Sequence, residues 1–145
     1  MDRDIEISQF RDYLKFKNLR MTPQRELILT EFLEMKGHFT IEDLFSNVIK
    51  KSSTLGIATL YRNMILMVEA GLAIEHKFNN GKTTFEHRYG TRHHDHLICV
   101  SCNKIEEFES PMIEKLQNET ANEHKFFLQS HKMELYGICR TCSNP

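Results

Sequence analysis

Apolar residues in the first part of the chain recur with the spacing of amphipathic helices. Residues 5–17 place apolar positions three and four apart, with charged residues between them, which predicts a helix. Thr22-Pro23 predicts a second helix start, because Thr can cap the first free amides and Pro at the first helical position sacrifices no needed donor. We expect this helix to end near Gly37.

Two further helices follow in the same region. Thr40 opens one of them, with Asp43 three residues later in a capping-box arrangement. The other is expected from about Ile57 to Ala70, where Gly71 stops it. Residues 50–53 form a polar break between the two helices.

A change of period marks a hairpin after the helices. Residues 72–78 and 82–87 predict two short strands around an Asn79-Asn80-Gly81 turn, and Asn-Gly is a strong hairpin signal. Helices followed by a hairpin are the pattern of a winged helix-turn-helix. We therefore expect residues 1–88 to form one domain.

The remainder of the chain predicts a second, α+β domain over residues 92–145, joined through a hinge at residues 89–91. Residues 96–100 and 104–108 predict strands, and Pro111 predicts the start of a helix through about His124. Residues 126–138 alternate and predict a long last strand. The expected fold class is α+β, with a winged helix-turn-helix first and an α/β domain second.

The composition of the chain limits which classes of binding partner we expect. Of 145 residues 40% are hydrophobic and 27% charged, with a net charge of −1, so any nucleic-acid surface must be local. No apolar run approaches the roughly 20 residues of a membrane span. The segment Met1-Asp2-Arg3-Asp4 carries three charges and no hydrophobic region follows it, so it does not resemble a secretory signal. These features predict a cytoplasmic protein without a membrane partner.

The four cysteines predict a metal site. Cys99 and Cys102 form one CxxC pair and Cys139 and Cys142 another, and two such loops complete a closed tetrahedral shell for Zn²⁺. The favoured interpretation is structural zinc. A redox dithiol pair is the alternative.

The sequence His93-His94-Asp95-His96 is dense in possible ligands. In an extended segment His94 and His96 share one face while His93 and Asp95 share the other, so this segment could serve two metal sites. Partners for the first face are His38, Glu86 and Glu107. Nitrogen and carboxylate ligands suit Fe²⁺, Mn²⁺ or Zn²⁺, and the alternative is a solvated His-rich loop.

Four stretches give the chain a resemblance to a known family. They are residues 20–25 (RMTPQR), 58–62 (ATLYR), 94–99 (HDHLIC) with Cys102, and 135–139 (LYGIC) with Cys142. Together they cover nearly the whole chain and resemble the ferric uptake regulator family of metal-dependent transcriptional regulators. The resemblance implies a homodimer that binds double-stranded operator DNA when a divalent regulatory metal is present, and it makes residues 92–145 the dimerisation domain.

The resemblance also implies site residues. The regulatory metal, Fe²⁺ or Mn²⁺, would be held by His38, Glu86, His94, His96 and Glu107. A possible third metal site would use His93, Asp95, Glu114 and His131, although His131 also fits an ordinary structural histidine in the predicted strand.

The predicted helix 58–70 is the recognition helix by the same resemblance, with Thr59, Tyr61 and Arg62 facing the major groove. Arg can pair with guanine and Tyr can contact thymine methyls. Five further basic residues are candidates for contact with DNA phosphates, and the alternative for each lysine is a solvated surface charge. They are Arg20, Arg25, Lys50, Lys51 and Lys82.

Several functions remain open. Glu at positions 86 and 107 with Tyr61-Arg62 resembles the iron-uptake repressors, while the peroxide-stress repressors, in which His38 or His94 would be oxidised, are the alternative. No Cys is left for a zinc-uptake regulatory site. A catalytic metal centre is disfavoured because five protein ligands leave no open position for a small-molecule substrate. A metal-storage module that does not bind DNA is the third possibility.

Overall fold

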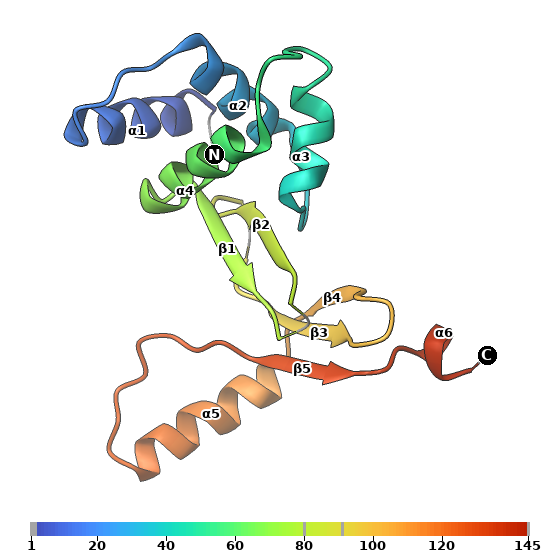
Figure 1. Ribbon diagram of the computed structural model, residues 1–145. Coiled ribbons are helices and arrows are strands. Elements are labelled where there is room, and N and C mark those ends of the chain that lie inside the picture. The colour runs from blue at the N-terminus through green and yellow to red at the C-terminus, as the bar shows by residue number, and fades with distance from the viewer. Residues whose placement is uncertain (1–2, 80, 91, 145) are drawn as a thin grey trace. The chain divides into compact units, whose positions relative to one another are not determined.

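A computed structural model describes residues 3–79, 81–90 and 92–144. The chain divides into two compact units, residues 1–91 and 92–145, and each is described by itself (Figure 1). Within the described residues, no helix is both long and apolar enough to cross a membrane.

Unit 1 consists of four helices followed by a β-hairpin (Figure 1). The helices are α1 (Arg3–Phe16), α2 (Pro23–Glu34), α3 (Ile41–Val48) and α4 (Ile57–Glu69), and the strands are β1 (Ala73–Lys77) and β2 (Thr83–His87). The strands pair antiparallel. This order of elements is the winged helix-turn-helix that the hydrophobic pattern predicts.

Local capping chemistry explains where two of these helices begin. The Thr22 hydroxyl accepts a hydrogen bond from the Arg25 amide at 3.2 Å, and Pro23 occupies the first helical position. Thr40 and Asp43 cap each other's backbone amides in a capping box at the start of α3. Both predicted helix starts are therefore confirmed.

One hydrophobic core holds unit 1 together, with contributions from every helix and from the hairpin. Phe39 links the segment before α3 to β2, since its amide and carbonyl both bond to Phe85, at 2.9 and 2.7 Å. The buried core residues are Phe10, Leu14, Ile28, Leu29, Phe32, Phe39, Leu44, Val48, Leu55, Leu60, Met64, Met67, Leu72, Ala73 and Phe85.

Unit 2 is built on a three-stranded sheet of order β4-β3-β5. The central strand β3 (Asp95–Cys99) pairs antiparallel with β4 (Ile105–Phe108) and parallel with β5 (Glu134–Gly137). Helix α5 (Pro111–Glu123) lies between β4 and β5 in the chain, and the short α6 (Arg140–Ser143) follows β5. In Figure 1 a wide loop returns from the end of α5 to β5.

The prediction of a long strand at residues 126–138 is wrong for most of these residues, because only Glu134–Gly137 forms a strand. Phe126, Phe127 and Leu128 are three consecutive apolar residues without alternation, and they are 71%, 92% and 40% exposed. Strand β3 offers only a short pairing edge, so pairing runs from Glu134 to Gly137 alone. Helix α6 was not predicted.

The two predicted connecting segments are partly described. Tyr89 and Gly90 form a turn in which Gly90 has φ +77°, while Thr91 of the predicted hinge lies outside the described residues. In the hairpin turn Gly81 has φ +79°, and Asn80 likewise lies outside the described residues.

Candidate metal centres and nucleic-acid interface

The parallel pairing of β3 with β5 brings the two CxxC pairs together. Cys99 ends β3 and Cys139 precedes α6, so each pair sits where a strand leaves the same edge of the sheet. All four sulfurs lie within 4.8 Å of one another, and Cys102 Sγ is 3.8 Å from Cys139 Sγ. Zn–S bonds of about 2.3 Å in a tetrahedron require sulfurs about 3.8 Å apart, whereas a disulfide needs about 2 Å. The geometry therefore fits a shared metal.

Backbone amides prepare one of these thiols to bind a cation. The Cys139 amide donates to Cys99 Sγ at 3.3 Å. Hydrogen bonds from the backbone of Cys139 and then of Cys102 lower the pKa of Cys99 to about 6. The pKa of Cys142 is raised to about 12, chiefly by its hydrogen bond with the Cys139 side chain. The cluster thus holds at least one thiolate near neutral pH, as a metal ligand requires.

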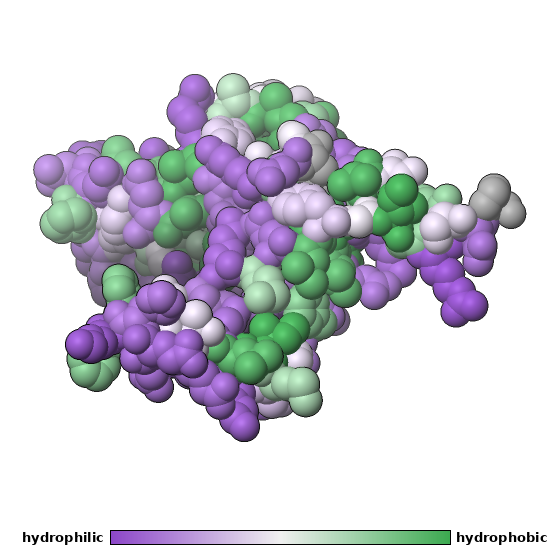
Figure 2. Space-filling view, turned by 90° about the horizontal axis from the view of Figure 1, so that it is seen from below, coloured by the Kyte–Doolittle hydropathy of each residue, from purple (hydrophilic) through white to green (hydrophobic). Residues whose placement is uncertain are grey.

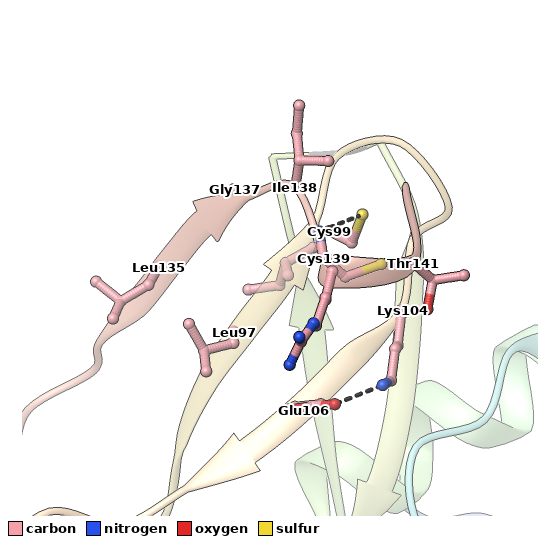
Figure 3. Close-up of a pocket in the computed structure, with 11 residues that line it drawn as sticks. Leu97, Cys99, Lys104, Glu106, Leu135, Gly137, Ile138, Cys139 and Thr141 are labelled. Carbon is pink, nitrogen blue, oxygen red and sulfur yellow. Dashed lines mark hydrogen bonds and ion pairs between the residues drawn. The ribbon is translucent and has the colours of Figure 1, made fainter. Parts of the chain in front are cut away.

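A groove of about 270 Å³ borders the four-cysteine cluster (Figure 3). Leu97 and Leu135 come from the neighbouring strands β3 and β5, and an ion pair of Lys104 with Glu106 at 2.5 Å lies on its rim. The groove exposes apolar strand surface beside the sulfurs without adding a ligand to them.

A second cluster in unit 2 contains His93, Asp95, Glu114 and His131, whose ligand atoms lie within 4.8 Å of one another. His93 Nε2 is 2.9 Å from His131 Nε2 and 3.4 Å from Glu114 Oε1. Asp95 is only 2% exposed, yet its Oδ1 has no hydrogen bond and lies 3.4 Å from His131 Nε2. A buried carboxylate oxygen without a hydrogen bond is costly unless a positive charge lies beside it, so this set fits a bound cation.

The other face of the same segment carries further side chains of the types that bind metals. The His94 and His96 rings lie 4.8 Å apart, and His94 Nε2 is 3.6 Å from Glu107 Oε1. Glu107 lies opposite His96 in the β3–β4 register. Unit 2 therefore presents two histidines and a carboxylate together.

Unit 1 contains its own histidine–carboxylate group. Glu86 on β2 is 2% exposed, and its Oε2 lies 3.3 Å from His38 Nε2. The Phe39–Phe85 bonds hold the segment containing His38 against β2. His76 on β1, which sequence reasoning did not select, lies with its Nε2 2.6 Å from Glu86 Oε1. The available signal was its position on the same face of the hairpin as Glu86.

The first turns of α4 present the predicted DNA-reading residues. Tyr61 is 39% exposed, its ring packs edge-on against Phe85, and its hydroxyl donates to Glu75 at 3.3 Å. The Arg62 guanidinium donates to Thr59 Oγ1 at 3.2 Å. Thr59 and Arg62 thus form a polar pair on the helix, while Tyr61 contacts the hairpin.

The predicted phosphate contacts differ in their surroundings. Lys50 and Arg20 are exposed. Arg25 Nη1 donates to the Arg20 carbonyl at 2.6 Å. Lys51 forms an ion pair with Glu31, whose side chain is only 7% exposed, so Lys51 already has a role in the fold.

Comparisons with known proteins agree with this architecture. Residues 17–136 match the model of the ferric uptake regulator family. The chain is 37% identical over 146 residues to the ferric uptake regulation protein of Campylobacter upsaliensis, covering 99% of this chain and 93% of that protein. It is 40% identical over 130 residues to that of Bordetella parapertussis, covering 89% and 93%.

Solved structures give the same result. The Helicobacter pylori ferric uptake regulator, described as having three functional metal-binding sites, matches with a TM-score of 0.90 and 25% identity over 100% of this chain and 96% of that one. The ferric uptake regulator of Francisella tularensis with iron matches with a TM-score of 0.78 and 35% identity over 87% and 96%. The chain therefore belongs to the ferric uptake regulator family of metal-dependent regulators.

Proposed function

We propose that this protein is a transcriptional repressor that binds double-stranded operator DNA as a homodimer when ferrous iron is available. Residues 1–88 serve as the DNA-binding domain and residues 92–145 as the metal-binding dimerisation domain. Residues 89–91 serve as the hinge between them. The names of the relatives and the iron-containing structure of one of them support the choice of iron.

The observation that carries the proposal is that each unit already holds part of one ligand set. His38 and Glu86 lie 3.3 Å apart in unit 1, and His94 and Glu107 lie 3.6 Å apart in unit 2 beside His96. Ligand atoms around a metal with bonds of about 2.1 Å are about 3 Å apart. The spacing within each unit suits such a shell, and the family relationship supports assigning all five residues to one regulatory site.

The regulatory metal, Fe²⁺ or Mn²⁺, would supply a bond between ligands of the two units. His38 and Glu86 belong to the half with the recognition helix, so their attachment to His94, His96 and Glu107 fixes the angle between the halves. A symmetric dimer must match the spacing of its two recognition helices to two half-sites on DNA. Metal occupancy then controls DNA affinity without any chemical reaction, which makes the protein a regulator and not an enzyme.

The four cysteines are proposed to hold structural Zn²⁺. A Cys₄ set is closed and leaves no position for a substrate. The cluster of His93, Asp95, Glu114 and His131 is proposed as a third metal site, which the buried, non-hydrogen-bonded oxygen of Asp95 supports.

Exposed apolar surface supports the homodimer. Helix α5 buries none of its residues, and Met112 and Leu116 are 74% and 56% exposed. A groove of about 690 Å³ between α5 and residues 126–133 is lined largely by apolar side chains. Hydrophobic patches reach the surface in Figure 2. Patches of this kind are typical of protein interfaces, and a second copy of unit 2 is the partner that the family relationship supports.

DNA contact is assigned to α4. Arg62 and Tyr61 reach base edges, with Thr59 beside them, while Arg20, Arg25 and Lys50 contact phosphates. Lys51 is a weaker candidate because of its ion pair with Glu31.

The test is an anaerobic titration of the zinc-loaded dimer with Fe²⁺, followed by fluorescence anisotropy of labelled DNA from its own promoter. We expect binding only with Fe²⁺, reversal by a chelator, and no change after a stoichiometric dose of peroxide. Loss of binding together with one oxygen atom added at His38 or His94, detected by mass spectrometry, would assign the protein to peroxide sensing instead.

Matched variants separate the parts of the proposal. Arg62→Ala should abolish DNA binding and leave Fe²⁺ uptake unchanged, whereas Glu86→Ala should weaken Fe²⁺ uptake and leave zinc content unchanged. Lys15→Ala, an exposed cation in α1 outside every proposed contact, is the control. Unchanged operator affinity in both Arg62→Ala and Tyr61→Ala would contradict the assignment of α4 and favour a metal-storage role.

A further inference from the structure

His76 lies against a carboxylate that the proposed function uses. Its Nε2 is 2.6 Å from Glu86 Oε1, and the other oxygen of the same carboxylate, Oε2, is 3.3 Å from His38 Nε2. His76 is 8% exposed and Glu86 is 2% exposed. The two oxygens of Glu86 therefore have separate neighbours, one on each side, within unit 1.

The hairpin register explains this contact. Glu86 lies opposite Ile74, and His76 lies opposite Thr84, so His76 is the diagonal neighbour of Glu86 on the same face. The His76 ring is stacked on Phe78, with centroids 5.4 Å apart and planes within 2°. Phe78 is itself buried. Stacking and register together hold the imidazole in place.

The direction of the hydrogen bond follows from the chemistry of the pair. An ionised carboxylate only accepts hydrogen bonds, so Nε2 of His76 must carry the proton and donate it to Oε1. A Glu side chain can rotate about its terminal torsion, and the backbone of β2 does not fix where its oxygens point. The donated bond fixes this rotation and turns Oε2 toward His38.

We infer that His76 is a positioning residue of the regulatory metal site, which aims Glu86 at the metal without being a ligand itself. The inference rests on the proposed function only in taking Glu86 as a ligand. Hydrogen bonds to metal ligands typically contribute about 10–100-fold to metal affinity, because they fix the orientation and the basicity of the ligand. His76 is thus expected to set how tightly this chain holds its regulatory metal.

The test uses the full-length, zinc-loaded protein and two variants, one of which removes the hydrogen-bond donor of His76 and the other its aromatic ring. His76→Phe keeps an aromatic ring to stack on Phe78 but removes the donor. His76→Gln keeps an amide N–H donor and removes the ring. Co²⁺ is the probe, since its visible absorption reports coordination, and its affinity is measured by competition with a chelator.

We expect His76→Phe to weaken Co²⁺ binding about 10–100-fold and His76→Gln to recover most of that loss. The Co²⁺ absorption bands should keep their positions in His76→Gln, and zinc content should stay unchanged in both. Lys77→Gln, an exposed residue of the same strand as His76, is the control and should bind as the unsubstituted protein does. In the double variant His76→Phe/Glu86→Ala the loss should equal that of Glu86→Ala alone.

Three outcomes would overturn the inference. If Glu86→Ala weakens Co²⁺ binding but His76→Phe does not, His76 has no positioning role, although the regulatory site stands. If neither weakens it, the regulatory site itself is wrongly assigned. If X-ray absorption shows one nitrogen ligand fewer in His76→Gln, His76 is a ligand. Thermal unfolding of unit 1 before Co²⁺ is added shows whether each variant is folded.

Discussion

Removal of the four-cysteine metal should unfold unit 2 and leave unit 1 folded. Among the described residues of unit 2 only Asp95, His96, Ile98 and Cys99 are buried, and Ile98 is the one large aliphatic side chain among them. Unit 1, by contrast, contains the whole hydrophobic core cluster. The two units therefore differ sharply in what holds them together.

The relative magnitudes decide the outcome. Full burial of one Ile side chain contributes about 1.5–3 kcal/mol. A structural Zn²⁺ ion contributes about 10–16 kcal/mol in small zinc domains. The metal therefore contributes several times more free energy to folding than the buried aliphatic side chain of unit 2 does. The sheet β4-β3-β5 should not persist without it.

Hydrogen exchange followed by mass spectrometry tests this difference directly. The variant Cys99→Ser/Cys102→Ser removes one pair of ligands, and Thr141→Ala, an exposed residue between the other two cysteines, is the control. In the double variant, peptides from residues 92–144 should exchange like an unfolded chain, while peptides from α2 and α4 keep their protection. Retained protection in β3 and β5 after complete loss of zinc would refute the reasoning.

Three other results are expected. Lys51→Ala should destabilise unit 1 by about 1–3 kcal/mol in urea unfolding, because it leaves the buried Glu31 carboxylate without its ion pair. The control Lys50→Ala should leave the stability unchanged, and equal stabilities of the two variants would contradict the prediction. The folded-state pKa of Cys99 is lowered to about 6. Its thiolate therefore stabilises unit 2 fully at pH values above the usual thiol range, and this contribution is lost as the pH falls through about 6. Zinc release recorded with an indicator dye should increase as the pH is lowered, because protons compete with Zn²⁺ for the thiolates, and retention of zinc at about pH 4 would count against this expectation. Asp95→Asn should lower the metal content by one ion per chain in elemental analysis with the zinc retained, and an unaltered metal content would remove the third site from the proposal.

Local chemistry made much of the fold predictable. The helix starts at Thr22-Pro23 and Thr40 depend on side chains that bond to amides within three residues, so the sequence alone carries the signal. The α+β class and the winged helix-turn-helix follow from the same short-range patterns. The pairing of CxxC loops is equally local, since two residues between thiols suit one tetrahedral ion.

Features that depend on pairing between distant segments were not predictable. Alternation over residues 126–138 suggested a longer strand, but the length of β5 is set by its partner β3. His76 was missed because its contact with Glu86 depends on the hairpin register, which places the two on one face but diagonally apart. The ion pair of Lys51 with Glu31 joins residues 20 positions apart, which no periodicity reports.

The parallel pairing of β3 with β5 has a consequence for biosynthesis. Cys99 and Cys139 are 40 positions apart in the chain. At about 5–20 residues per second, a ribosome needs about 2–8 s to make the second pair of cysteines after the first. During that time unit 1 can already fold, whereas the first two thiols have no partners with which to complete a metal shell. Zinc insertion is therefore a late step in making this protein, and a chain interrupted before Cys139 would contain a folded DNA-binding unit that cannot complete its zinc site.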